Sequence, residues 1–176
     1  RDGLKIIQDS SETYRRSLAV KSSEGVYVVP AFTGLGAPYW LPSCRGAIFG
    51  LTRGTSQDHL IRATLESLAY QTEDVLQDAG MKLTALKVDG GASKNDFLMQ
   101  FQSDISNCDV HRSLISETTA LGAACLAGLA VGFWKDKQEI IDNFKSGSQF
   151  TPAINEEERS KLLEGWHRAI EAAMKF

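Results

Sequence analysis

The stretch LKVDGGASKNDFLMQ, residues 86–100, joins a short apolar run to two adjacent glycines and then to a helical apolar pattern. Gly90 and Gly91 therefore stand where a buried strand is predicted to be followed by a helix. Glycine weakens regular structure by roughly 0.5–1 kcal/mol relative to alanine. Two glycines at a strand end indicate a place where the main chain comes unusually close to another group.

Other apolar runs also predict strands. VYVVPAF, which begins at Val26, is rich in β-branched and aromatic residues, and Pro30 ends it. GAIFGLT predicts a second strand at 47–51, and we expect these two strands to pair because successive strands usually neighbour one another. A third strand is predicted at 85–89 and a short one at 108–112, within CDVHR.

Helices are predicted between and after these strands. A polar cluster at 55–58 starts a long helix that ends near Gly80. Ser93 and Asp96 start a second helix. Both helices have apolar residues at helical spacing, and these are Ile61, Leu65, Leu68, Thr72 and Val75 on the first and Leu98, Phe101 and Ile105 on the second.

The C-terminal part of the chain also reads as helical. The segment Thr118–Gly132 consists largely of Ala and Gly, and such small side chains predict a helix buried against another element. A helix near 137–144 follows. Asn155 and Glu158 form a capping pair for a last helix, whose predicted buried stripe is Leu162, Trp166 and Ile170. Strands that alternate with helices place the chain in the α/β class.

Composition excludes several kinds of partner. The 176 residues are 43% hydrophobic and 23% charged, with a net charge of −3 and scattered Lys and Arg residues. A nucleic-acid groove or an anionic membrane patch is therefore not expected. The chain has no membrane-length apolar run. Its three cysteines lack metal-site spacing and predict buried free thiols in a reducing, cytoplasmic compartment, and these are Cys44, Cys108 and Cys125.

Known phosphate-binding motifs do not account for the glycines. No Walker P-loop occurs, and Gly34-Leu35-Gly36 starts a dinucleotide fingerprint in which Tyr39 replaces the third glycine. The sequence also has no Gly-x-Ser-x-Gly elbow. The three histidines lack metal-ligand neighbours and are interpreted as surface or core residues, and these are His59, His111 and His167.

The segment Asp89-Gly90-Gly91-Ala92-Ser93 remains as a candidate site. Without Cβ atoms at 90 and 91, the main chain can adopt a positive φ and leave a flat ledge against which adenine or phosphate could lie. Asn95, in the first turn of the next helix, can donate and accept hydrogen bonds as a purine or ribose requires. The alternative from spacing alone is an ordinary glycine turn capped by Ser93.

Several longer motifs carry a family resemblance. They are GAIFGL from Gly46 to Leu51, followed by His59-Leu60 and Ala63-Thr64-Leu65-Glu66, then VDGGASKN, and ETTALGAACLAGLAVGFW. Through these motifs nearly the whole chain resembles the C-terminal domain of the FGGY carbohydrate kinases. GVYVVPAFTGLGAPYW, from Gly25 to Trp40, resembles the glycerol kinases within that family more closely than the pentulose and hexulose kinases.

The resemblance implies an actin-like, ribonuclease-H-like ATPase domain with a mixed sheet flanked by helices. It implies that residues 1–176 are a C-terminal nucleotide-binding domain, in which Gly90, Gly91 and Ala92 face the adenosine of ATP and Asn95 contacts the base. Mg²⁺ and ATP would be used to phosphorylate glycerol to glycerol 3-phosphate. The helix from Thr118 would help form the hinge between domains, and the full-length enzyme is expected to be a homo-oligomer.

The family's glycerol contacts, catalytic base and phosphate-binding loops lie upstream of the segment that this chain resembles. We therefore assign no catalytic residue here and expect the chain by itself to be inactive. Asp89 matches the nucleotide motif rather than a base, and Glu66 is interpreted as structural or interdomain. The chain starts at Arg1 without a methionine, and its first ten residues read like the end of a helix. We interpret it as part of a longer protein.

Three other functions stay open at this point. The first is phosphorylation of another polyol or sugar by a kinase of the same family. The second is a nicotinamide-dependent oxidoreductase, although Tyr39 occupies the position of its third glycine. The third is a non-enzymatic interaction module with an actin-like fold.

Overall fold

The computed structural model describes residues 6–114, 118–143 and 146–176. Its strands are β1 (Tyr27–Val29), β2 (Ala47–Phe49), β3 (Ala85–Val88), β4 (Asp109–Ser113) and β5 (Ser146–Phe150). Its helices are α1 (Glu12–Ser17), α2 (Gln57–Asp78), α3 (Asp96–Ser106), α4 (Thr118–Ala130), α5 (Lys137–Asn143) and α6 (Glu156–Lys175), with a short 3₁₀ helix, η1 (Ala92–Lys94), before α3.

The strands form two small sheets. β1 and β2 pair antiparallel, with Val28 opposite Ile48, which confirms the predicted pairing. In the second sheet β4 is central, parallel to β3 on one side and antiparallel to β5 on the other. The sequence analysis missed β5, whose residues SGSQF lack an apolar run. The parallel pair β3–β4 is joined through η1 and α3, so the segment that contains the candidate ledge is the start of the crossover connection.

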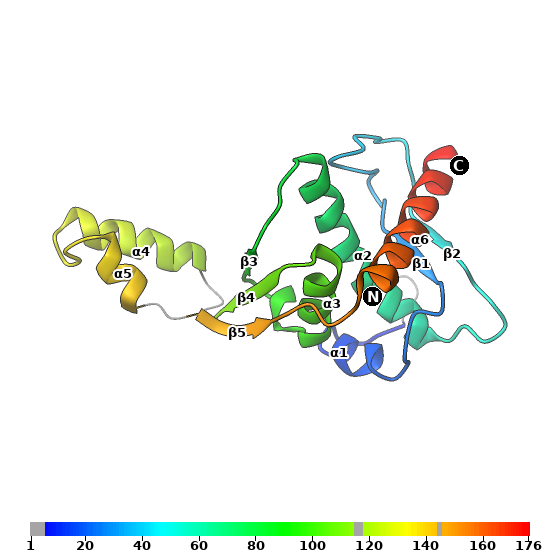
Figure 1. Cartoon of the computed structure of the whole chain (residues 1–176), viewed down its shortest axis with the longest axis horizontal. Helices are drawn as coiled ribbons and strands as arrows, with labels where there is room; N and C mark the ends of the chain where they lie inside the picture. The colour runs from blue at the N-terminus through cyan, green and yellow to red at the C-terminus, as the bar shows by residue number, and fades with distance from the viewer. Residues whose placement is uncertain (1–5, 115–117, 144–145) are drawn as a thin grey trace.

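The core lies where α6, α2 and α3 meet beside β1 (Figure 1). Trp166 of α6 is fully buried and stacks on Tyr70 of α2, with ring centroids 5.2 Å apart. Tyr70 in turn meets Phe101 of α3 edge-on at 5.4 Å. The predicted stripe on α6 is confirmed for Trp166 and Ile170, whereas Leu162 is only half-buried.

The apolar face predicted for α2 is only partly right. Ile61 and Leu65 are buried, but Leu68 and Val75 are each 43% exposed. The helix instead turns Ala69 and Tyr70 toward the core, with exposures of 0% and 1%. Because Tyr70 packs between α3 and α6, its side of α2 faces inward and Leu68 lies on another side.

The predicted helix end in the first ten residues is wrong for the residues that can be described. Residues 6–11 are not helical, and residues 1–5 lie outside the described part. Asp9 forms a turn in which its Oδ1 accepts the amide of Ser11 at 2.8 Å. Glu12 Oε1 accepts the amides of Gln8 and Asp9 at 3.2 Å. These polar contacts form the start of α1, a helix that the sequence analysis missed.

Helix α4 forms as predicted but does not pack as predicted. Among the residues described by the structure, Cys125 is the buried residue of α4, whereas Leu126 is 67% exposed. Figure 1 shows α4 and α5 extending away from the two sheets. Gly128 of α4 packs against the ring of Trp134, in the connection to α5, whereas much of the rest of α4 stays exposed among the described residues.

Two further observations concern the chain as a whole. All three cysteines are buried free thiols, which confirms their prediction. None of the described helices is both long and apolar enough to cross a bilayer.

Candidate functional site

The two glycines lie between β3 and α3, as the sequence predicts. β3 ends at Val88, and Gly90 adopts φ +83°, a left-handed conformation that favours glycine. Gly91 returns to φ −62°, ψ −42° and begins the 3₁₀ turn η1. The main chain therefore leaves the extended conformation of β3, passes through a left-handed residue at Gly90 and enters η1 after Gly91.

The main chain at this turn is open to its surroundings. A Cβ atom built on Gly90 or on Gly91 would meet no atom of the described residues within 4 Å. Gly91 and Ala92 are exposed, and Gly90 is half-buried. Close packing among the described residues thus does not explain the absence of side chains at 90 and 91. We call residues Gly90–Ala92 the ledge.

Asn95, rather than Ser93, caps helix α3. Its Oδ1 accepts the amide of Leu98 at 3.1 Å. Ser93 is buried within η1, where its hydroxyl donates to the carbonyl of Gly90 at 2.8 Å and closes the turn. Asn95 Nδ2 also donates to Thr13 Oγ1 of α1 at 3.3 Å. Each atom of the amide keeps hydrogen-bonding capacity beyond these contacts, so Asn95 can still contact a base.

Arg112 of β4 fixes the turn from the sheet side. Its Nη1 donates to the carbonyl of Ser93 at 3.0 Å and also to the carboxylate of Asp96. Its Nη2 donates to Ser148 Oγ at 2.9 Å, and the guanidinium lies 5.4 Å from the ring centroid of Phe150. The sequence analysis missed this residue, because its contacts lie 16 to 38 residues away in the chain.

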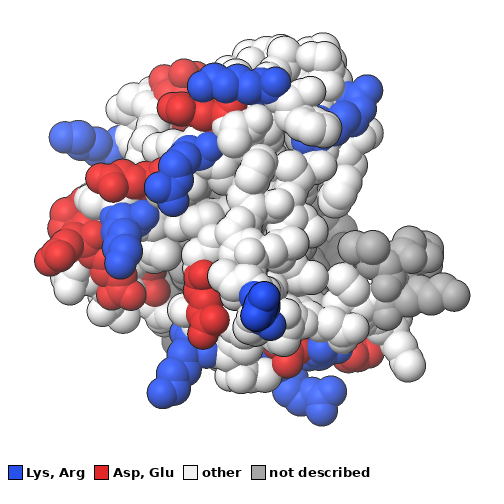
Figure 2. All heavy atoms as spheres, turned by 90° about the vertical axis from the view of Figure 1, so that its right-hand side faces the viewer, with Lys and Arg blue, Asp and Glu red and all other residues white. Residues whose placement is uncertain are grey.

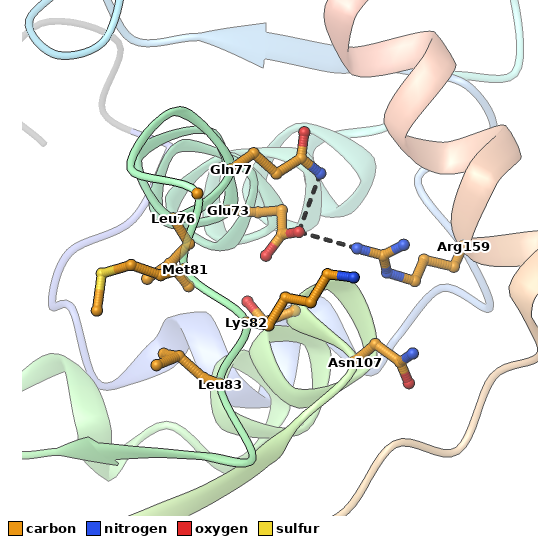
Figure 3. Close-up of a pocket in the computed structure, with 10 residues that line it drawn as sticks. Glu73, Leu76, Gln77, Met81, Lys82, Leu83, Asn107 and Arg159 are labelled. Atoms are coloured by element: carbon orange, nitrogen blue, oxygen red, sulfur yellow. Dashed lines mark hydrogen bonds and ion pairs between the residues drawn. The ribbon is translucent and has the colours of Figure 1, made fainter.

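A hollow lies at the opposite end of β3 from the ledge (Figure 3). It has a volume of about 570 Å³ and is lined by the end of α2, the connection to β3 and the start of α6. Glu73 Oε1 accepts from Arg159 Nη2 at 2.8 Å and from Gln77 Nε2 at 3.0 Å. Figure 3 shows the Lys82 side chain extending toward the Glu73–Arg159 ion pair. None of the residues that line this hollow belongs to the ledge, so the two are separate features.

The surface that contains β1 and β2 carries mixed charge. Figure 2 shows Lys and Arg side chains interspersed with Asp and Glu around an uncharged centre. An apolar groove of about 510 Å³ lies between β1, β2 and α2, lined in part by Val28, Phe32, Ile48 and Leu60.

The described residues contain no group of three His, Cys, Asp or Glu side chains that could hold a metal ion.

Comparison with known proteins identifies close relatives. The chain is 58% identical to glycerol kinase 1 of Clostridium tetani and 57% identical to the glycerol kinase of Bacillus subtilis. Each match covers 100% of this chain and 36% of the relative, so the chain spans about a third of their length.

Solved structures show the same fold. The crystal structure of Plasmodium falciparum glycerol kinase with ADP superposes with a TM-score of 0.88 at 36% identity, over 96% of this chain and 35% of that one. Gluconate kinase from Lactobacillus acidophilus, at 23% identity and a TM-score of 0.79, covers 97% of this chain and 36% of its own. These likenesses confirm the predicted actin-like, ribonuclease-H-like α/β fold.

The family comparison agrees with both results. Residues 3–131 match the C-terminal domain of the FGGY family of carbohydrate kinases. The chain therefore belongs to the FGGY family of carbohydrate kinases, and it corresponds to their C-terminal domain.

Proposed function

We propose that residues 1–176 form the nucleotide-binding domain of a glycerol kinase, and that the ledge with Asn95 receives the adenosine of ATP. The observation that carries this proposal is the open main chain at Gly90 and Gly91, which no described part of the chain fills. The identity of 57–58% to glycerol kinases, against 22–23% to the gluconate and xylulose kinases of known structure, supports glycerol as the acceptor. The ADP named for the Plasmodium relative supports a nucleotide ligand.

The chemistry of phosphoryl transfer fits a domain of this kind. Such transfer depends on positioning and on charge stabilisation rather than on covalent chemistry by the protein. The ledge would hold the adenosine, while the glycerol contacts and the catalytic base would come from a partner domain. Closure of the two domains would exclude water that otherwise hydrolyses the nucleotide. Mg²⁺ would be held by the phosphates and by the partner domain, because the described residues offer no acidic cluster for it.

Helix α4 is the proposed contact with that partner domain. Its sequence is apolar on every side, and helices of that type are normally buried. Leu126 and Val131, 67% and 80% exposed, would be covered when the domains meet. We also propose a cytoplasmic homo-oligomer, and the buried free thiols support the reducing compartment.

The substitution Gly91→Val in the full-length kinase tests the proposal. Gly91 has φ and ψ values that any residue adopts, and a Cβ there meets no described atom within 4 Å. The fold should therefore tolerate valine, while the side chain would occupy the surface of the ledge. We expect the KM for ATP and the Kd for ADP to rise at least about tenfold, since the loss of close stacking on the ledge is worth about 1.4 kcal/mol or more. The KM for glycerol should not change.

The matched control is Gly36→Val. Gly36 is also exposed, has no positive φ and would meet no described atom within 4 Å, but it lies in the loop between β1 and β2. An unchanged nucleotide affinity in Gly91→Val would refute the assignment of the ledge. Activity of the full-length protein with xylulose or gluconate, and none with glycerol, would refute the proposed acceptor.

A further inference from the structure

Arg62 of α2 lies where α1, α2 and α3 meet. Its Nε donates to Glu66 Oε1 at 2.8 Å, one turn further along the same helix. Its Nη1 donates to the carbonyls of Ser17 and Val20, at 3.3 and 2.9 Å, at the end of α1. The guanidinium also lies 4.6 Å from the ring centroid of Phe97, in the first turn of α3. One side chain therefore contacts α1, α2 and α3.

The contacts of Arg62 with α1 and with Phe97 both connect it to Asn95. α1 carries Thr13, whose hydroxyl oxygen accepts a hydrogen bond from the side-chain Nδ2 of Asn95. Phe97 lies two residues after Asn95 in the chain, on the helix that Asn95 caps. Arg62 thus holds the element that orients the Asn95 side chain and also the turn that carries its main chain.

The contacts of Arg62 are largely shielded from solvent. Its side chain is 15% exposed, and that of Glu66 is 3% exposed. Glu66 Oε2 has no hydrogen-bond partner among the described residues, so the carboxylate acts on Arg62 through one oxygen. A guanidinium offers a planar set of donors and an aromatic-stacking face, whereas a lysine ammonium is a point charge on a flexible stem. Lysine could not make the three kinds of contact together.

We propose that Arg62 is a positioning residue of the nucleotide site, because it holds α1 and the first turn of α3 in the arrangement that orients Asn95 toward the base. This inference rests on the proposed function of the ledge. It assigns to Arg62 no contact with the nucleotide. Coupling through packed side chains of this kind is typically worth 0.5–2 kcal/mol, or about 2- to 30-fold in affinity.

The test compares four variants of the full-length kinase. Arg62→Met and Arg62→Lys remove the planar donors, and both should raise the KM for ATP and the Kd for ADP by roughly tenfold. The KM for glycerol should stay within twofold of wild type. Arg53→Met is the matched control, because Arg53 is exposed in the turn before α2. Gly91→Val, measured in parallel, reports on the ledge itself.

A separate pair of variants does not depend on the stability of Arg62 variants. Thr13→Val removes the oxygen that accepts from Asn95, whereas Thr13→Ser keeps it. We expect weaker nucleotide binding in Thr13→Val and recovery in Thr13→Ser. The increase in melting temperature on adding saturating ADP gives a further readout. A purely structural role would lower the melting temperature with and without ADP equally and leave the ADP-induced increase unchanged.

The outcomes separate the two proposals. If Gly91→Val weakens ADP binding but folded Arg62→Met and Thr13→Val bind it normally, the role of Arg62 is refuted and the ledge stands. If Gly91→Val has no effect, the proposed function of the ledge fails. If Arg62→Met does not fold, the comparison of Thr13→Val with Thr13→Ser decides the question.

Discussion

Gly165 sits where α6 comes closest to β1. A Cβ atom built at this position would lie 2.8 Å from Tyr27 Cε2 and closer still to the Cζ and Oη atoms of that ring. The Tyr27 hydroxyl donates to the carbonyl of Leu162, one turn earlier in α6, at 3.3 Å. The bare main chain of Gly165 therefore admits a tyrosine ring against the helix. We predict that Gly165→Ala destabilises the fold.

Two opposing terms determine the size of the effect. Replacing glycine by alanine inside a helix should stabilise it by about 1 kcal/mol. Overpacking a filled core typically costs 1–3 kcal/mol, and displacing the ring also loses a hydrogen bond worth about 1 kcal/mol. The net destabilisation is therefore about 1–3 kcal/mol. For a chain of this size, each kcal/mol corresponds to a decrease in melting temperature of about 2–4 °C.

Thermal and urea unfolding of single and double variants test this reasoning. In a Tyr27→Ala background the obstructing ring is absent, so adding Gly165→Ala should become neutral or stabilising. Gly36→Ala in the loop between β1 and β2 is the control, because a Cβ there meets no described atom within 4 Å and should not lower stability. The reasoning is wrong if Gly165→Ala is as stable as wild type, or if the sign does not change in the Tyr27→Ala background.

Three further predictions concern buried polar groups. Asp74 accepts hydrogen bonds from Tyr39, Trp166 and His167, at 2.9, 2.7 and 3.1 Å, so Asp74→Ala should cost about 3 kcal/mol in urea unfolding, and a loss below about 1 kcal/mol would contradict this. Burial raises the pKa of Glu66 above its ordinary 4.5, although Arg62 acts in the opposite direction. The unfolded state therefore releases the Glu66 proton at a lower pH than the folded state does. Wild type should therefore lose stability relative to Glu66→Gln as the pH rises above 4.5, and a difference in melting temperature that stays constant from pH 4 to 8 would exclude it. Burial also raises the pKa of the Cys108 thiol, so the native protein should react with Ellman's reagent far more slowly than the unfolded protein, and equal rates would disprove that.

The elements that the sequence predicted well have strong local signals. β1 ends where Pro30 follows it, and Asn155 caps α6 by accepting the amide of Glu158 at 2.9 Å. The missed elements, α1 and β5, have six and five residues and are mostly polar, so neither periodicity nor apolar runs mark them. Their formation depends on contacts with distant residues. β5, for example, pairs with a strand more than 30 residues earlier in the chain.

Burial on α2 was harder to predict than its helical structure. Glu66 and Asp74 are buried because Arg62, Trp166 and Tyr39 supply hydrogen bonds to them. Hydrophobic periodicity counts both residues as polar and assigns them to the surface. The same periodicity counts Leu68 as apolar and assigns it to the core, although the residue is exposed. A pattern of apolar residues can thus locate a helix, whereas its orientation depends on partners that come from other parts of the chain.

The same distinction applies to the glycines that suggested the site. The sequence does not distinguish Gly165 from Gly91, because either glycine lets another group come close to the main chain. At Gly165 the approaching group is Tyr27 of the same chain, so the fold itself requires glycine. At Gly91 the backbone conformation suits any residue and the neighbouring space is open among the described residues, so the fold gives no reason for a missing side chain. Gly36 and Gly122 have the same freedom, so an open glycine by itself does not identify a ligand site. Gly91 differs from them because it follows Gly90 and precedes the cap Asn95 at the start of the β3–α3 crossover, and this placement is the reason we propose the ledge for the adenosine.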